Sequence, residues 1–194
     1  MTMEQPGSWP SWQDDLELLT QAAQSAGAIA MSHFKKDVEV FWKNDGASPV
    51  TAADFAANEE LSRILRQARP DYGWLSEESE DDDRRLQTRR VFVVDPIDGT
   101  RAFMHGRETW CISAAVVEDG RPVAGVLVAP ALFEIWQATA DGYAARNGMP
   151  VLAAEWDGSR KLVLSGADDM FQKISPEAMA SIDRRKSVPS LAYR

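Results

Sequence analysis

The ten residues 91–100, Val-Phe-Val-Val-Asp-Pro-Ile-Asp-Gly-Thr, place the strongest constraint on how this chain can fold. Four apolar, mostly β-branched residues are typical of a buried strand. Pro96 has no N–H to donate to a sheet, so we expect the strand to stop there and Asp95 to lie at its end. The carboxylates of Asp95 and Asp98 and the carbonyl of Ile97 then supply three hard oxygen atoms, the ligands that Mg²⁺ or Ca²⁺ prefers.

The residues after this strand allow two interpretations. Gly99 lets the backbone approach a ligand closely, and a helix that begins at Gly99-Thr100 would point its free N–H groups at an anion. A metal and a phosphate would then meet at one site. The alternative is an ordinary turn, because Asp, Pro and Gly are the commonest turn formers.

Composition bounds the class of protein. The chain has 194 residues, of which 44% are hydrophobic and seven are Trp, enough for one domain or two small ones. No apolar run approaches the ~20 residues that cross a membrane, and the first residues lack a signal-peptide pattern. The single cysteine, Cys111, permits no internal disulfide. We therefore expect a cytoplasmic protein without a membrane partner.

The charge of the chain bears on its ligand. A net charge of −9 argues against a nucleic-acid-binding surface, which needs a basic stripe. A phosphorylated substrate would need cations to be held on so acidic a chain, which agrees with a metal site. A nucleic-acid partner is therefore not expected.

Hydrophobic spacing predicts two helices before the central stretch. Ser11-x-x-Asp14 and Thr51-x-x-Asp54 both resemble capping boxes. Apolar residues then recur at helical spacing up to Phe34 in the first segment and up to Ala68 in the second. Asp54 has two interpretations at this stage: a first-turn acid that complements the helix dipole, or a functional group.

Strands are predicted after the central stretch. Alternating apolar residues, separated by Asp-Gly and Asn-Gly turn signals, predict an antiparallel meander. Its strands span residues 110–118, 123–129, 134–139 and 142–146. Cys111 falls on the first of them, where we expect a core residue rather than a nucleophile. A strand at 162–165 and a short helix capped by Ser175-Pro176 indicate the start of a second α/β unit. A further strand is predicted at 186–188, followed by a helix start at Pro189-Ser190.

The motif Asp95-Pro-Ile-Asp-Gly-Thr100, preceded by Leu75-Ser-Glu-Glu78, closely resembles the signature of the inositol monophosphatase family, from about Leu16 to the last residue. The resemblance implies a magnesium-dependent, lithium-sensitive phosphomonoesterase that acts on a small phosphorylated metabolite. It also implies an α/β (α+β layered) fold of alternating helix and sheet layers, and a homodimer. A large, mostly antiparallel sheet precedes a smaller α/β half. We therefore expect a metal-site domain at 1–150 and the start of a second, incomplete domain at 151–194.

The resemblance implies a set of metal ligands. Glu77, Asp95 and the carbonyl of Ile97 would hold one Mg²⁺ ion, and Asp95 and Asp98 would hold a second together with a later aspartate. Two or three ions are expected, two of them about 3.5–4 Å apart. Glu78 would support these ligands from outside.

The resemblance also implies catalytic and substrate-binding roles. Thr100, backed by Asp54, would orient a metal-activated water for in-line attack on phosphorus, and Glu77 would take part through its metal. Asp98 and the N–H groups of Gly99 and Thr100 would bind the substrate. No covalent phosphoenzyme is required.

Three further segments support or qualify the resemblance. Ser48-Pro-Val-Thr-Ala-Ala-Asp54 resembles the family segment whose aspartate holds a water-bound metal, and Lys43 resembles the lysine that faces the metals. Ser187-Val-Pro-Ser-Leu-Ala192 resembles the segment that precedes the W-D-x-A-A-type motif with the later aspartate. That motif is absent from the 194 residues, so we expect a chain cut short at its C-terminus.

The residues leave the substrate open among branches of the family. Arg101-Ala102 fits neither the asparagine usual in inositol phosphatases nor the Lys-Glu pair of the nucleotidases. Ser48–Thr51 resembles the nucleotidase and histidinol phosphatase branches, whereas His105-Gly106 resembles the inositol phosphatases. We favour an inositol-1-phosphate-type phosphatase. The alternatives are a 3'(2'),5'-bisphosphate nucleotidase, a histidinol phosphatase, or a catalytically incomplete protein that binds metal or phosphate.

Overall fold

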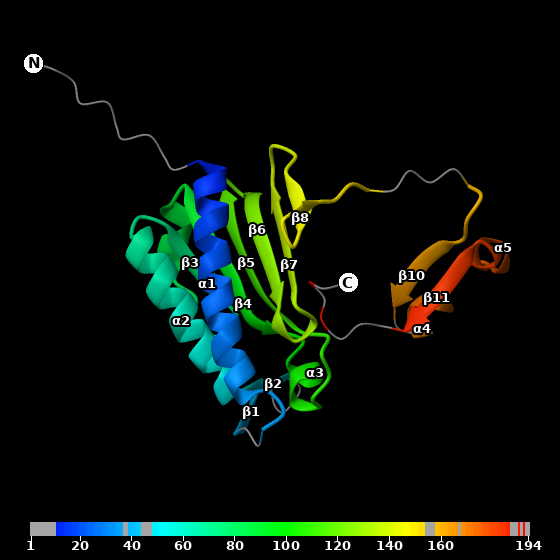
Figure 1. Ribbon diagram of the computed structural model, residues 1–194, viewed down its shortest axis with the longest axis horizontal. Coiled ribbons are helices and arrows are strands. Elements are labelled where there is room, and N and C mark those ends of the chain that lie inside the picture. The colour runs from blue at the N-terminus through cyan, green and yellow to red at the C-terminus, as the bar shows by residue number, and fades with distance from the viewer. Residues whose placement is uncertain are drawn as a thin grey trace, which may run out of the picture.

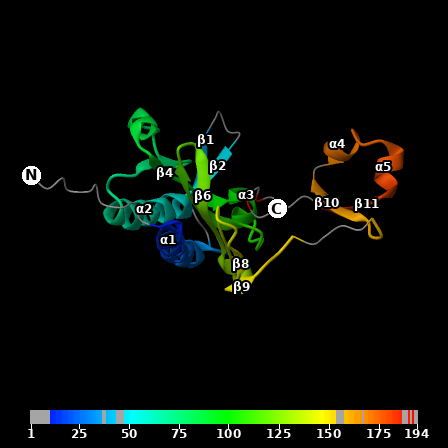
Figure 2. The ribbon, with the colours of Figure 1, turned by 90° about the horizontal axis from the view of Figure 1, so that it is seen from above.

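The computed structural model describes residues 11–36, 39–43, 48–153, 158–166, 168–186, 190 and 192. Helices α1 (Trp12–His33) and α2 (Ala52–Ala68) lie side by side across one face of a seven-stranded sheet (Figures 1 and 2). Its strands lie in the order in which they occur in the chain. They are β3 (Gly73–Ser76), β4 (Arg90–Asp98), β5 (Cys111–Glu118), β6 (Arg121–Ala129), β7 (Glu134–Thr139), β8 (Ala144–Arg146) and β9 (Met149–Pro150).

The directions of the strands confirm the predicted large, mostly antiparallel sheet. Strands β3 and β4 are parallel, and each later neighbour pair in this sheet is antiparallel. The hairpin turns Asp119-Gly120 and Asn147-Gly148 have positive φ at both residues, which suits the right-handed twist of the flanking strands. The predicted meander is therefore present, with β9 as an additional short strand.

Both long helices begin at the capping boxes predicted from the sequence. The backbone N–H of Asp14 donates to the Ser11 hydroxyl at 3.1 Å, and the N–H of Ser11 donates back to the Asp14 carboxylate at 2.9 Å. The N–H of Thr51 donates to Asp54 in the same way at 2.8 Å. These pairs satisfy donors that a helix start leaves without an intrahelical partner. The apolar faces of both helices then pack on the sheet, in one core with β4, β5 and β6.

A buried ion cluster joins the start of α1 to the start of β4. The Arg90 guanidinium lies 2.9 Å from the Asp15 carboxylate and 2.7 Å from that of Glu118. The Tyr72 hydroxyl also donates to Asp15, at 3.0 Å. Asp15 is 0% exposed and Arg90 is 4% exposed. Because a buried charge is stable only when paired, this cluster fixes the strand that carries the central motif against the helix layer.

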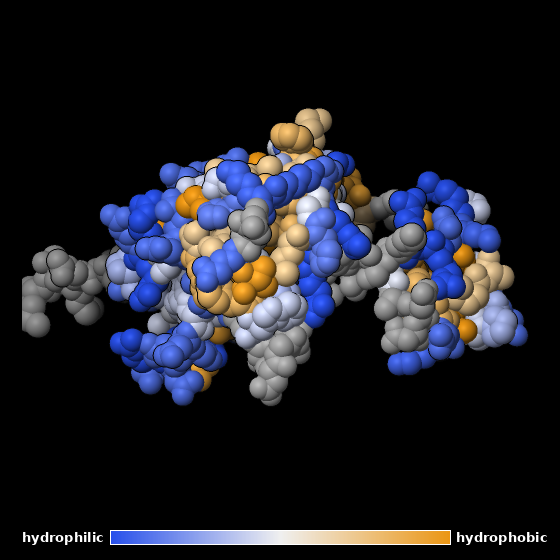
Figure 3. Space-filling view, turned by 90° about the horizontal axis from the view of Figure 1, so that it is seen from below, coloured by the Kyte–Doolittle hydropathy of each residue, from blue (hydrophilic) through white to orange (hydrophobic). Residues whose placement is uncertain are grey.

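The hairpin of β1 (Val40–Lys43) and β2 (Ser48–Thr51) leads directly into α2. Phe41 of this hairpin packs edge-on against Phe55 of α2, with ring centroids 5.8 Å apart, and both rings are partly exposed. Figure 3 views the end of the molecule that carries the hairpin and shows apolar side chains gathered there among charged ones. This contact holds the hairpin on the first turns of α2 and so helps to place Thr51 and Asp54.

Residues 162–186 form a small βαβ unit (Figure 1). Strands β10 (Leu162–Gly166) and β11 (Ile182–Lys186) are parallel, and α4 (Asp168–Phe171) and α5 (Pro176–Ala180) lie between them in sequence. The predicted strand at 162–165 and the helix capped by Ser175 are confirmed. The strand predicted at 186–188 overlaps β11 only at Lys186, and residues 187–189 lie outside the described residues. The division of the chain at residue 150 stays a prediction.

Three short helical segments complete the described chain. They are η2 (Asp83–Gln87) before β4, α3 (Thr100–Met104) after it, and η3 (Pro130–Leu132) between β6 and β7. None of the helices in the described ranges is both long enough and apolar enough to span a membrane.

The ion cluster gives a first testable prediction. Replacing Arg90 by Met removes the buried cation that pairs with Asp15 and leaves this carboxylate only the longer contact with Arg69, at 3.3 Å, and the Tyr72 hydroxyl. We therefore expect Arg90→Met to lower the free energy of unfolding by about 3 kcal/mol. Urea unfolding of the full chain measures this change. Arg89→Met is the matched control, because Arg89 also contacts Glu118 but its side chain is 48% exposed. We expect the control to change stability by about 1 kcal/mol or less, and an equal loss in both variants would contradict the importance of the buried cluster.

Candidate active site

The central motif forms an irregular end of strand β4. The prediction that pairing stops at Pro96 is wrong, because β4 continues to Asp98. Asp95 pairs with Ser113 and Asp98 pairs with Cys111, with a shift of register between them. The shift accommodates Pro96, which cannot donate to the neighbouring strand. Asp95 and Asp98 therefore both lie at this end of β4, and both are half-buried.

The parallel pairing of β3 and β4 brings Glu77 beside this motif. Ser76 pairs with Val94, and the N–H of Glu77 donates to the Val94 carbonyl at 3.4 Å. Parallel neighbouring strands point in the same direction, so the residues that follow a matched pair lie next to each other. Glu77 follows Ser76 and Asp95 follows Val94, so these two residues are neighbours. Glu77 is exposed there and Glu78 is half-buried. Both glutamates thus reach the same edge as Asp95.

Helix α2 supplies a further carboxylate from its first turn. Asp54 is 1% exposed, and its Oδ2 accepts hydrogen bonds from the N–H and hydroxyl of Thr51 at 2.8 and 2.6 Å. Its Oδ1 lies 3.2 Å from the Thr100 hydroxyl, which also lies 3.0 Å from the Ile97 carbonyl. Asp54 therefore caps the helix, as the first interpretation expects, and it also contacts the central motif. Its functional role stays a prediction.

The carboxylates act on one another electrostatically. The pKa of Asp95 rises from 3.8 to about 8, chiefly because the group is desolvated, and then because Glu77, Asp98 and Asp54 repel its negative charge. The N–H of Ile97 acts in the opposite direction by donating to Asp95. Burial also raises the pKa of Asp54 above its ordinary value, despite the donors on Thr51 and Thr100. A cluster of like charges in a partly dry setting favours either a bound proton or a bound cation.

The donor set suits a hard divalent cation in type, although it does not form a closed cage. The groups that act on Asp95 are carboxylates, and the Ile97 carbonyl lies within hydrogen-bond distance of the same Thr100 hydroxyl as Asp54. Carboxylate and carbonyl oxygens are the chemistry of Mg²⁺ and Ca²⁺ sites. Within the described ranges, however, no three His, Cys, Asp or Glu side chains converge closely enough to hold a metal ion as they stand. Binding would therefore need side-chain rearrangement, for which the exposed Glu77 is well placed.

The turn after the motif confirms the predicted helix start. Gly99 precedes α3 with φ +95°, in the left-handed region that favours glycine. The N–H groups of Ala102 and Phe103 donate to its carbonyl at 2.8 and 3.1 Å, so the turn is closed from within. A glycine at position 99 is therefore favoured by the backbone conformation, in addition to the close approach to a ligand that was predicted from the sequence.

Other polar residues of the motif region have structural explanations. His105 is exposed, and its Nδ1 lies 2.6 Å from the Arg101 carbonyl. Cys111 is 0% exposed, and burial is the main cause that raises the pKa of its thiol to about 12, so it is no nucleophile in this setting. The side chain of Lys43 lies outside the described residues. The contact of Ser190 with Asp98 is the feature that sequence reasoning missed, because 92 residues separate the two and no local spacing signals the contact.

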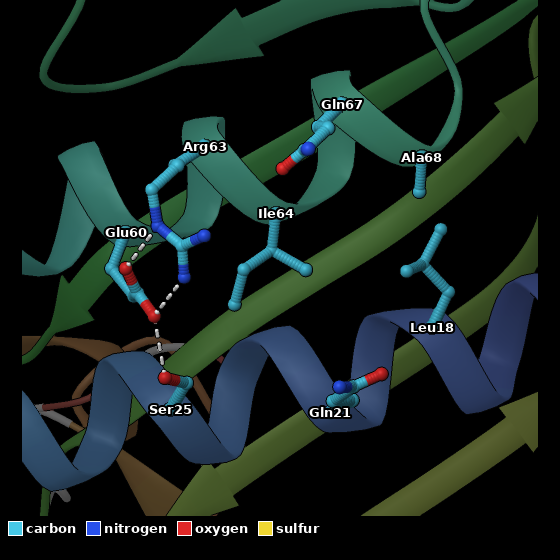
Figure 4. A pocket seen from close by; sticks show the side chains of 8 residues that line it. All are labelled: Leu18, Gln21, Ser25, Glu60, Arg63, Ile64, Gln67 and Ala68. Atoms are coloured by element: carbon cyan, nitrogen blue, oxygen red, sulfur yellow. Dashed lines mark hydrogen bonds and ion pairs between the residues drawn. The ribbon is translucent and has the colours of Figure 1, made fainter.

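A groove of about 470 Å³ lies between α1 and α2 and contains none of these carboxylates (Figure 4). Glu60 crosses it, accepting hydrogen bonds from Arg63 at 2.8 Å and from the Ser25 hydroxyl at 2.6 Å. These contacts, led by Arg63, lower the pKa of Glu60 to about 2. Glu60, Arg63 and Ser25 thus satisfy one another, and we assign no ligand to the groove.

Asp95 makes the stability of the chain depend on pH. Without divalent cations, the folded chain keeps a proton on Asp95 between about pH 4 and 8, whereas the unfolded chain has released it. The folded state binds more protons in this window, so this group makes the free energy of unfolding fall as the pH rises. Urea unfolding in chelator, at several pH values, should show a steeper fall for the wild type than for Asp95→Asn. Parallel pH profiles for the two proteins would contradict the raised pKa.

Comparison with known proteins agrees with this geometry. The profile of the inositol monophosphatase family matches residues 11–190. A histidinol-phosphatase of Chlorobaculum parvum is 36% identical over 138 residues, which are 71% of this chain and 52% of that protein. The 3'(2'),5'-bisphosphate nucleotidase CysQ of Salmonella typhimurium is 39% identical over 120 residues, 60% of this chain and 48% of that protein. The chain therefore spans about half the length of these curated relatives.

Solved structures share the fold. The Thermotoga maritima IMPase superposes with a TM-score of 0.77 at 29% identity, covering 92% of this chain and 70% of that one. The extragenic suppressor protein SuhB of Bartonella henselae superposes with a TM-score of 0.82 at 26% identity, covering 92% and 72%. A layered α/β architecture, a carboxylate cluster at an irregular strand end and a matching family profile lead to one conclusion: the chain belongs to the inositol monophosphatase family.

Proposed function

We propose that this chain catalyses Mg²⁺-dependent hydrolysis of a small phosphomonoester. The observation that carries the proposal is the gathering of Glu77, Asp95, Asp98 and Asp54 around the irregular end of β4, where they repel one another. Membership of a family of metal-dependent phosphatases supports it. Such a site needs positive charge, and a doubly charged cation supplies it in the smallest volume.

The residues that would hold Mg²⁺ are those assigned from the sequence. Asp95, Asp98, Glu77 and the Ile97 carbonyl offer the oxygen donors that this ion prefers. Two or three ions would neutralise charge on the phosphoryl oxygens when bound. The half-buried position of Asp95 strengthens its interaction with a cation, because little water competes for it.

Thr100 and Asp54 would position the attacking water. When the Thr100 hydroxyl donates its proton to Asp54 Oδ1, at 3.2 Å, the lone pairs of Thr100 Oγ are directed elsewhere and can accept a hydrogen bond from water. Burial raises the pKa of Asp54, which increases its capacity to attract that proton. Gly99, at the start of α3, would let a phosphate approach the N–H groups of Gly99 and Thr100.

The relatives of this chain suggest three candidate substrates. The two curated relatives described above are a histidinol-phosphatase and a bisphosphate nucleotidase, whereas the Thermotoga structure is an IMPase. We keep inositol 1-phosphate as the first candidate because of His105-Gly106, with histidinol phosphate and adenosine 3',5'-bisphosphate as alternatives. A homodimer and a cytoplasmic location are parts of the same proposal.

A phosphate-release screen tests the activity. We expect the full chain to release phosphate from at least one of inositol 1-phosphate, histidinol phosphate, adenosine 3',5'-bisphosphate and fructose 1,6-bisphosphate, and only when Mg²⁺ is present. Thr100→Val removes the hydroxyl that orients the water, so we expect it to lower kcat by about 100-fold or more. Asp98→Asn should cause a similar loss, because an uncharged amide binds the cation more weakly than a carboxylate does.

Asp141→Asn is the matched control for Asp98→Asn. Asp141 also accepts a hydrogen bond from a hydroxyl, that of Thr139, but it lies on the β7–β8 turn and not at the motif. We expect its activity to equal that of the wild type. Turnover in chelator, or full activity of Asp98→Asn, would contradict the proposal. Failure of all four substrates at saturating Mg²⁺ would favour a catalytically incomplete protein that binds metal or phosphate.

A further inference from the structure

Asp98 receives two hydrogen bonds from residues far along the chain. The Ser190 hydroxyl donates to Asp98 Oδ2, and the backbone N–H of Ala192 donates to the same oxygen at 2.7 Å. Both bonds run towards this carboxylate oxygen, which accepts from a hydroxyl and from an N–H. One oxygen of a candidate metal ligand is thus held by donors that the central motif does not contain.

The surroundings of Ser190 show that this contact is enclosed by the fold. Ser190 is 0% exposed, and its hydroxyl lies 3.6 Å from the Cys111 sulfur. The Ser190 hydroxyl has one hydrogen, which it donates to Asp98. In the contact between Cys111 Sγ and Ser190 Oγ, the protonated thiol of Cys111 is therefore the donor. The order of donation therefore runs from Cys111 to Ser190 to Asp98.

Gly99 makes room for this approach. A Cβ atom at Gly99 would lie 3.2 Å from the Ser190 Cβ and 3.2 Å from the Thr109 carbonyl oxygen, closer than most side-chain contacts. The absence of a side chain therefore has a second use besides the positive φ. It lets Ser190 lie against Gly99, the residue that follows Asp98.

We propose that Ser190 is a positioning residue, which with the Ala192 N–H fixes the orientation of the Asp98 carboxylate and thereby sets the affinity of the site for a divalent cation. This inference rests on the proposed function, since it assigns Asp98 to a metal. Groups that orient a ligand from outside typically change metal affinity by about 10–100-fold when removed. The two donors act on one oxygen, so removing one of them should give an effect near the lower end of that range.

Binding of Mn²⁺ to the full chain, followed by electron paramagnetic resonance, tests the inference without turnover. We expect Ser190→Ala to weaken Mn²⁺ binding by about tenfold. The Mg²⁺ concentration for half-maximal phosphate release should rise by a similar factor, while kcat at saturating Mg²⁺ stays close to that of the wild type. A residue that only completes the core would lower the folded fraction without this shift in metal affinity.

Two further variants keep the test decisive. Ala192→Pro removes the N–H donor of an exposed residue without altering a buried side chain, so it should weaken Mn²⁺ binding even where Ser190→Ala folds poorly. Ser25→Ala is the matched control, because it removes a serine-to-carboxylate hydrogen bond of 2.6 Å to Glu60, in the groove of Figure 4. We expect the control to bind Mn²⁺ as the wild type does.

The outcomes separate this inference from the proposed function. Folded Ser190→Ala and Ala192→Pro proteins with wild-type Mn²⁺ affinity would overturn the positioning role while leaving the hydrolase proposal intact. A wild type that binds Mn²⁺ but hydrolyses none of the four substrates would contradict the hydrolase, and the affinities of the variants would still decide the role of Ser190. A wild type that binds no Mn²⁺ would overturn both.

Discussion

Mutual repulsion among carboxylates is the constraint on which this site depends. Asp95 is half-buried at the end of β4, and the charges of Glu77, Asp98 and Asp54 all oppose its ionisation. Carboxylates that repel one another move apart unless a proton or a cation binds between them. The rest of the fold must therefore hold these carboxylates together, and a bound divalent cation would relieve the repulsion among them.

The fold imposes it through elements on either side of the motif. Parallel pairing of β3 with β4 carries Glu77 to the same edge as Asp95, and the capping box of α2 holds Asp54 by two hydrogen bonds from Thr51. At the opposite end of β4, the buried Arg90 cluster fixes the strand to α1. Because this cluster anchors the first residues of β4, the repelling carboxylates at the last residues of the strand can stay close together. Unfavourable local interactions of this kind are common at functional sites.

Much of this could be predicted from the sequence because the signals are local. Capping boxes and apolar spacing identified α1 and α2, and Asp-Gly and Asn-Gly turns identified the meander. Pairing beyond Pro96 could not be predicted, because a register shift depends on the neighbouring strand rather than on the proline. Strand β11, Ile-Asp-Arg-Arg-Lys, is charged and takes its direction from pairing with β10. The Ser190 contact depends on the path of the whole chain, so no spacing signals it.

The most direct test of the account is the stability of Asp95→Asn with and without Mg²⁺. If repulsion dominates in the absence of a cation, this variant should be more stable than the wild type in chelator at pH 7. Folding of the wild type then requires Asp95 to take up a proton, whereas an amide needs none. Saturating Mg²⁺ should reverse the order, stabilising the wild type by about 2.7 kcal/mol at 100 times its Kd and the variant by much less. A wild type whose urea midpoint does not respond to Mg²⁺, or a variant that responds equally, would contradict the claim that these carboxylates form a cation site.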